Sequence, residues 1–307
     1  MGDVVPDFAF PEFLAGGDGR QRLSEFRGQP VLIVNWTDTD FGRGASDKVR
    51  KLAESAVPDG LVVVLRDTHG KSADEILCSR LRRYPDSPAR FIRNMKDRVT
   101  YADNGPPPDV ALIDMEGRLV LAGSYTVDLG KAEKLIKAEL KKRRSGWGEH
   151  GAARKTRALL YGKERLGEAR ALIEGALAAE PSDAELLAVQ AEVHADFSRR
   201  ERTIRYATER GECGRALDEA RALRAAVEGA PEWVATADEL LATFETPESQ
   251  RELELDEDLA SLLKRMRKKL RESEVEKLRK LAAEAGSDSA VGRRAAELAR
   301  VAALCLD

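Results

Sequence analysis

Two aspartates and an arginine lie close together in the stretch VNWTDTDFGRGAS, residues 34–46, directly after an apolar run. Asp40 and Arg43 are three residues apart, so their side chains can pair if a helix begins here. The unpaired amides of a helix N-terminus favour an anion, so Asp38 or Asp40 could cap such a helix. The same side chains could instead bind a small anion or polar ligand. The stretch contains no cysteine, and it therefore offers no thiol nucleophile.

The other side chains that could do chemistry are scattered along the chain. The three cysteines are Cys78, Cys213 and Cys305. No two of them have CxxC spacing, so the sequence predicts neither a dithiol motif nor a disulfide framework. The three histidines are His69, His150 and His194. Their separation gives no metal-ligand spacing, and we expect no metal site and no cofactor.

Strands and helices alternate around the aspartate-rich stretch. Residues 29–36 and 60–67 are dense in Val, Leu and Ile, which is typical of buried parallel strands. Residues 46–57, between them, have helical spacing. Ser72 and Glu75 form a capping box, which predicts the start of a second helix.

The pattern ends with a hairpin and a helix. Residues 109–123 indicate two strands around a Glu-Gly turn. Residues 127–144 form an amphipathic pattern whose cations gather at the C-terminal end, where the helix dipole favours them. The expected order is strand, helix, strand, helix, hairpin, helix.

The first ~145 residues resemble the redoxin branch of the thioredoxin-like family. Three segments carry the resemblance in the family's order: VVPDFAFPEF, DGRQRLSEFRGQPVLIVNW and GPPPDVALIDMEGRLVLAG. The resemblance implies a thioredoxin-like α/β fold. It also places the family's cis-proline at Pro108.

The thiol chemistry that the resemblance implies is missing. The two cysteines of the family's CxxC motif fall on Asp40 and Arg43. Gly44, Ala45 and Ser46 occupy the turn where peroxiredoxin-type relatives place their cysteine. We therefore expect no catalytic residue here. The alternative is that this region binds a ligand. The pocket would then be formed by Trp36, Asp38, Asp40, Arg43 and Pro108.

The second half is almost entirely helical in pattern and follows a glycine-rich break near residues 145–151. Ala169, Ala176 and Pro181 keep the spacing of the second helix of a tetratricopeptide repeat, which this half resembles weakly. Ser182 and Glu185 suggest a capping box after the proline. Residues 255–285 form one long amphipathic pattern with a basic outer face, either solvated or a docking surface for an acidic partner.

The composition limits the classes of partner that this protein is expected to bind. The net charge is −3 and neither half is strongly basic, which argues against nucleic acid. No segment approaches the ~20 apolar residues of a membrane span. We expect a cytoplasmic protein if this sequence is the complete chain, and an exported one if a leader has been removed.

Two domains are therefore expected: a thioredoxin-like α/β domain over residues 1–146, and an all-α domain of repeat-like helical hairpins over residues 152–307. The function that we predict is a redox-inactive interaction or scaffold module that binds protein or peptide through the helical domain. Two alternatives stay open. One is a thiol–disulfide oxidoreductase or peroxidase relative that uses a non-standard cysteine. The other is a binder of a small anion or ligand at Asp40, Arg43 and Pro108.

Overall fold

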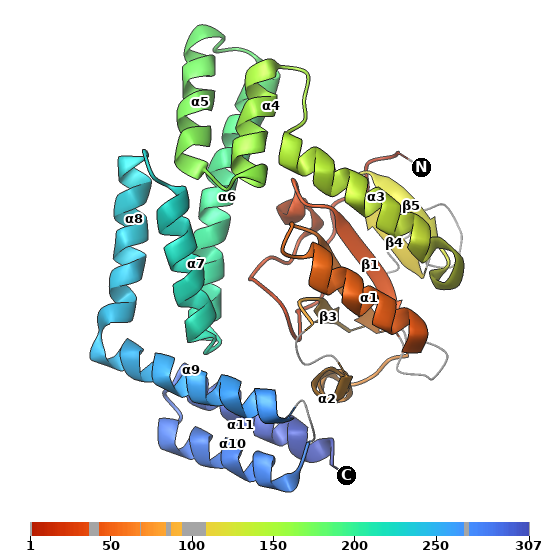
Figure 1. Ribbon diagram of the computed structural model, residues 1–307, viewed down its shortest axis with the longest axis vertical. Coiled ribbons are helices and arrows are strands. Elements are labelled where there is room, and N and C mark those ends of the chain that lie inside the picture. The colour runs from red at the N-terminus through yellow and green to blue at the C-terminus, as the bar shows by residue number, and fades with distance from the viewer. Residues whose placement is uncertain are drawn as a thin grey trace. The chain divides into compact units, whose positions relative to one another are not determined.

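The computed structural model describes residues 2–36, 43–67, 69–83, 87–93, 109–266 and 270–306. The chain divides into two compact units, Met1–Arg143 and Arg144–Asp307 (Figure 1). The first unit contains a mixed sheet with helices, and the second is helical. This division into an α/β part and an all-α part agrees with the predicted fold class.

The described strands of the first unit form one sheet in the order β3-β2-β1-β4-β5. The strands are β1 Val31–Trp36, β2 Val62–Asp67, β3 Arg90–Ile92, β4 Val110–Ile113 and β5 Leu119–Gly123. β1, β2 and β3 are parallel, β4 runs antiparallel to β1, and β5 runs antiparallel to β4. The two predicted parallel strands and the predicted hairpin are confirmed. The short edge strand β3 was not predicted.

The helices of this unit are α1 Arg43–Ala56, α2 Ala73–Arg83 and α3 Tyr125–Ser145. The predicted capping box begins α2, because the Glu75 amide donates to Ser72 Oγ and the Ser72 amide donates to Glu75 Oε2. The order of elements is the predicted one with β3 added. Together with the strand directions, it gives the thioredoxin-like fold that the sequence resemblance implied.

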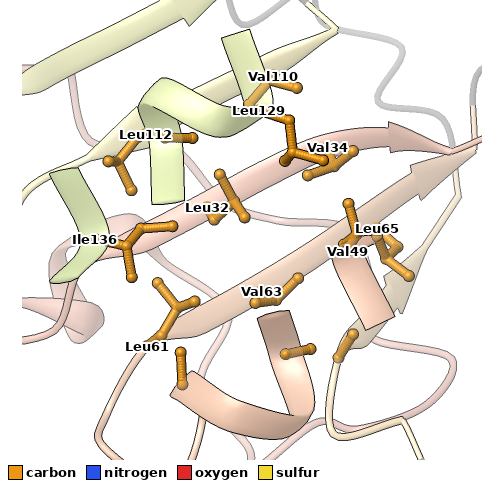
Figure 2. Close-up of a cluster of buried hydrophobic side chains, with 14 of the residues drawn as sticks. Leu32, Val34, Val49, Leu61, Val63, Leu65, Val110, Leu112, Leu129 and Ile136 are labelled. Atoms are coloured by element: carbon orange, nitrogen blue, oxygen red, sulfur yellow. The ribbon is translucent and has the colours of Figure 1, made fainter. Parts of the chain in front are cut away.

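One face of the sheet packs against the helices through an apolar layer. Leu32 and Val34 of β1 meet Val49 of α1 and Ile136 of α3 in one buried cluster (Figure 2). Side chains alternate between the faces of a strand, so these residues belong to the same face as Val63 of β2. This layer fixes the direction in which β1 runs toward the start of α1.

The opposite face is covered by the N-terminal segment, residues 5–26. Phe10, Phe13 and Phe26 pack there on Ile33 and Val64 in a second buried cluster. The phenylalanine rings meet at centroid distances of 5.6 and 5.7 Å.

The same segment also pairs with both edges of the sheet. Val4 bridges to Arg118 beside β5, and Ala15 bridges to Phe91 of β3. Both edges are therefore partly satisfied within the chain.

The second unit consists of helices that pack mainly on their neighbours in sequence (Figure 1). They are α4 Gly151–Arg157, α5 Leu166–Ala179, α6 Ala184–Glu209, α7 Cys213–Ala226, α8 Pro231–Ala242, α9 Pro247–Met266, α10 Glu272–Ala285 and α11 Ala290–Leu304, with η3 Ala158–Gly162 and η4 Thr243–Glu245 as short turns. α4 also packs on α6, α7 on α9, and α9 on α11. Such contacts to the next and next-but-one helix are typical of stacked helical hairpins.

Two expectations for this unit were wrong. Asp183, not Ser182, caps α6, and its carboxylate accepts from the Leu186 amide at 2.8 Å. Glu185 instead accepts from the His150 amide at 2.7 Å. The single amphipathic stretch predicted for residues 255–285 is two helices, α9 and α10.

The break between these helices has an electrostatic explanation. Lys264 and Arg265 end α9, whereas Glu272 and Glu274 begin α10. The sign of the charge therefore reverses where one helix dipole ends and the next begins.

Candidate functional site

The predicted site lies between the end of β1 and the start of α1. The structure ends β1 at Trp36 and begins α1 at Arg43, so the strand-to-helix junction is where the sequence placed it. Asp38, Asp40 and Pro108 lie outside the described residues. The pocket proposed for these residues with Trp36 and Arg43 therefore remains a prediction.

A polar pair, half-buried Asn35 and buried Arg66, occupies the same end of the sheet. Asn35 of β1 and Arg66 of β2 are register partners, and Arg66 Nε donates to Asn35 Oδ1 at 2.9 Å. Only 3% of Arg66 is exposed. Sequence reasoning missed this pair, although an arginine at the end of the apolar run VVVLR was a visible signal.

The neighbouring Asp67 has a structural role. It is completely buried, and its two carboxylate oxygens accept from the amides of His69 and Lys71 at 3.3 and 2.8 Å. A carboxylate that satisfies the amides of a following turn stabilises that turn. Asp67 therefore shapes the connection after β2.

A second buried ionic group lies on the face covered by the N-terminal segment. Arg90 Nη1 and Nη2 each donate to one oxygen of Asp18 at 2.6 Å, and Arg20 donates to Asp18 Oδ2 through Nε and Nη2. The guanidinium of Arg20 stacks 4.2 Å from the ring centroid of Phe26. Burial alone raises the pKa of Asp18, but the hydrogen bond and charge of Arg90, with the charge of Arg20, hold that pKa far below its ordinary value.

Cys213 is a free, buried thiol at the start of α7. Burial raises its pKa to about 12, and the nearby carboxylates of Asp256 and Glu252 act in the same direction. A thiol with such a pKa is almost entirely protonated at neutral pH, whereas the thiolate is the nucleophile. Cys213 is therefore unsuited to disulfide exchange.

The second unit has a buried arginine of its own. Arg157 of α4 donates to Glu185 and Glu192 of α6 at 3.0 and 2.7 Å, and to the carbonyl oxygen of Trp147 at 3.0 Å. Its guanidinium also stacks 5.0 Å from the ring centroid of Trp147. These contacts join α4 to α6 and to the segment before α4.

A shallow groove of about 490 Å³ runs between α10 and α11. Its floor is formed by small side chains, and two arginines contribute to its lining. The lining residues are Arg279, Ala282, Ala296, Ala299, Arg300, Ala303 and Leu304. Leu304 is 49% exposed, so the groove presents apolar surface to solvent.

Within the described ranges, no three His, Cys, Asp or Glu residues are grouped so as to hold a metal ion. None of the helices in that same part of the chain combines the length and the apolar composition needed to cross a bilayer.

Comparisons with known proteins cover the first unit. No family model and no curated protein matches the sequence. A protein of Neisseria meningitidis assigned as a thioredoxin is 16% identical, covering 46% of this chain and 92% of its own, with a TM-score of 0.37. A Chlorobium tepidum protein assigned as the thiol:disulfide interchange protein DsbE is 25% identical over 45% and 96%, with a TM-score of 0.35. The exposed lipoprotein thioredoxin Etrx1 of Streptococcus pneumoniae is 19% identical over 43% and 99%, with a TM-score of 0.33. At such TM-scores, the fold assignment rests on the strand order and strand directions.

Proposed function

We propose that this chain is a thioredoxin-like protein that does not exchange disulfides and that serves as an interaction or scaffold module. One observation carries the proposal: residues 34–46, where β1 passes into α1, contain no cysteine, and the chain has no CxxC pair. A helix N-terminus lowers the pKa of a thiol placed on it, so this is the position where the fold can activate one. Here Asp40 and Arg43 occupy the equivalent positions.

The alternative of a non-standard cysteine finds no support at Cys213. Its raised pKa and its burial both oppose nucleophilic attack. Redox activity would then require Cys78, within α2, or Cys305, directly after α11, and neither of them is a free thiol in the structure. Neither position is a helix N-terminus.

This proposal can be tested by turnover. The full chain should neither reduce insulin disulfides nor consume peroxide with a thiol donor. The matched control replaces Cys78, Cys213 and Cys305 with serine, which separates cysteine chemistry from background. Turnover that occurs in the wild type and disappears in this triple variant would disprove the proposal.

The helical unit supplies the interaction surface in this proposal. Ala169 and Ala176 lie on α5 at tetratricopeptide spacing, and Pro181 follows that helix. Stacked helical hairpins create extended surfaces that bind peptides and proteins. The partner that we propose is an acidic amphipathic segment of another protein. It would place apolar side chains on the alanine floor between α10 and α11, and its carboxylates would compete with Glu276 for Arg279.

The partner surface has its own test. Leu304→Glu adds a negative charge to the groove, whereas Leu187→Glu adds one to a comparably exposed leucine of α6. Cross-linking of the full chain to captured protein should decrease with the first variant and persist with the second. The cross-linked peptides should be acidic. Equal capture by both variants, or capture of basic peptides, would exclude this groove.

A ligand-binding function is the second candidate, using Trp36, Asp38, Asp40, Arg43 and Pro108. The observation that favours it is the part-buried Asn35–Arg66 pair at the same end of the sheet. Asp40→Ala distinguishes the two roles of this aspartate. If Asp40 caps the helix, its replacement should lower the free energy of unfolding by about 0.5–2 kcal/mol. A ligand-binding residue can be neutral or destabilising in the free protein, so its removal should leave the melting temperature unchanged or higher.

A further inference from the structure

The Arg66 guanidinium lies buried at the end of β2 with one hydrogen bond. Its Nε donates to Asn35 Oδ1, whereas Nη1 and Nη2 form no hydrogen bond or ion pair with any residue of the described ranges. A charge that is removed from water is costly unless other charges or hydrogen bonds compensate it. The neutral Asn35 amide supplies no counter-charge. Nη1 and Nη2 are not among the fully buried atoms that lack a partner, so the edge that they form is reached by solvent.

Within the described ranges, no carboxylate forms an ion pair with Arg66. Register places Arg66 on the same face of the sheet as Arg90 and Val64, the face covered by the N-terminal segment. Asp18, on that face, is shared by two other guanidiniums. Asp109 lies opposite Asn35 and is exposed, and it forms no hydrogen bond or ion pair with Arg66. Asp67 follows Arg66 directly, but strand alternation turns it to the other face, and its oxygens accept from turn amides.

The orientation of the guanidinium suggests what can bind it. Asn35 Oδ1 occupies the Nε side, which leaves the edge formed by Nη1 and Nη2. These two nitrogens present parallel N–H groups that match two oxygens of a carboxylate or a phosphate. An oxyanion bound end-on would satisfy both nitrogens and neutralise the charge.

We propose that Arg66, held in orientation by Asn35, binds a small oxyanion at the carboxyl ends of β1 and β2, on the sheet face opposite α1. The site uses described residues of two adjacent strands and does not depend on the proposed scaffold function. It uses neither Asp40 nor Arg43.

Calorimetric titration of the full chain tests the site with two probes, inorganic phosphate and acetate, at constant ionic strength. We expect saturable binding of at least one probe to the wild type. Tighter binding of phosphate would indicate a site for a tetrahedral anion, and tighter binding of acetate a site for a planar carboxylate. Arg66→Gln should weaken the binding at least tenfold. Arg22→Gln should not, because Arg22 is an exposed residue that pairs with Asp7.

Asn35→Asp keeps the proposal testable if Arg66→Gln does not fold. This change places a carboxylate beside the guanidinium, so it should raise the melting temperature without added anion and reduce the affinity for the probe. The proposal is overturned if the wild type shows no saturable binding, if Arg66→Gln binds as tightly as wild type, or if Asn35→Asp leaves the affinity unchanged.

Discussion

Arg66 and Arg157 are both buried arginines, one in each unit, and their surroundings differ. Arg157 donates to two glutamates and a carbonyl oxygen. Arg66 donates to one neutral amide. The buried guanidinium that joins two helices, that of Arg157, therefore has its charge balanced by two carboxylates. Burial alone therefore does not show that an arginine has a structural role. The number and charge of the groups that accept its hydrogen bonds are the better indication.

Asp18→Asn should give the largest effect, because it would remove the buried negative charge that Arg20 and Arg90 share. Removal of one partner from a buried ionic group costs about 3–5 kcal/mol. We expect a loss near the upper part of that range in urea unfolding. Asp47→Asn is the control, since the Asp47 side chain is 65% exposed, and exposed pairs contribute about 0–1 kcal/mol.

The same aspartate should control acid stability. The pKa of Asp18 is depressed in the folded state, so the stabilisation that it gives is present above the unfolded pKa of about 3.9 and declines as the pH falls below it. Wild-type stability should therefore fall between pH 4 and pH 2 more steeply than that of Asp18→Asn. Parallel pH profiles would contradict the assigned cause.

Arg157→Met should have the next largest effect, about 3 kcal/mol, because two partly buried glutamates lose their counter-charge. The measurement is chemical unfolding of the second unit, followed by fluorescence of Trp147, which Arg157 contacts. Arg165→Met serves as the control, since Arg165 pairs with Glu168 at the surface. A loss under about 1 kcal/mol would mean that the Arg157 cluster contributes little.

Arg66→Met should have the smallest effect on the stability of the protein without bound anion. The substitution removes a largely buried charge that has no counter-charge among the described residues, and it also removes the hydrogen bond to Asn35 Oδ1, so the two changes oppose each other. We expect a change within about 1 kcal/mol in chloride buffer. A loss comparable to that of Arg157→Met would show that the fold already compensates Arg66.

The sequence predicted the elements whose signal is local. β1, β2 and the hairpin were visible as apolar runs, and α2 was visible from its capping box. β3 was missed because three residues, Arg90–Ile92, carry no periodicity. The break between α9 and α10 was also missed, although the reversal of charge at Arg265 and Glu272 could have indicated it.

The buried polar groups could not be predicted from the sequence, for a different reason. Asn35 and Arg66 are 31 residues apart and meet through strand register. Asp18 and Arg90 are 72 residues apart and meet through the path of the N-terminal segment. Such pairs depend on tertiary packing, which spacing along the chain does not encode. The predicted site at Asp38, Asp40 and Pro108 lies outside the described residues.

The central claim is that the chain keeps a thioredoxin-like scaffold and lacks only its thiols. Asp40→Cys combined with Arg43→Cys tests this most directly, because it would place two sulfurs at the family spacing where α1 begins. The tryptic peptide of residues 28–48 would hold both and no other cysteine. After mild oxidation its mass should fall by two hydrogens, about 2 Da, as an internal disulfide requires, and the protein should gain weak insulin reductase activity. If both thiols stay free, residues 40 and 43 do not correspond to the family's cysteines.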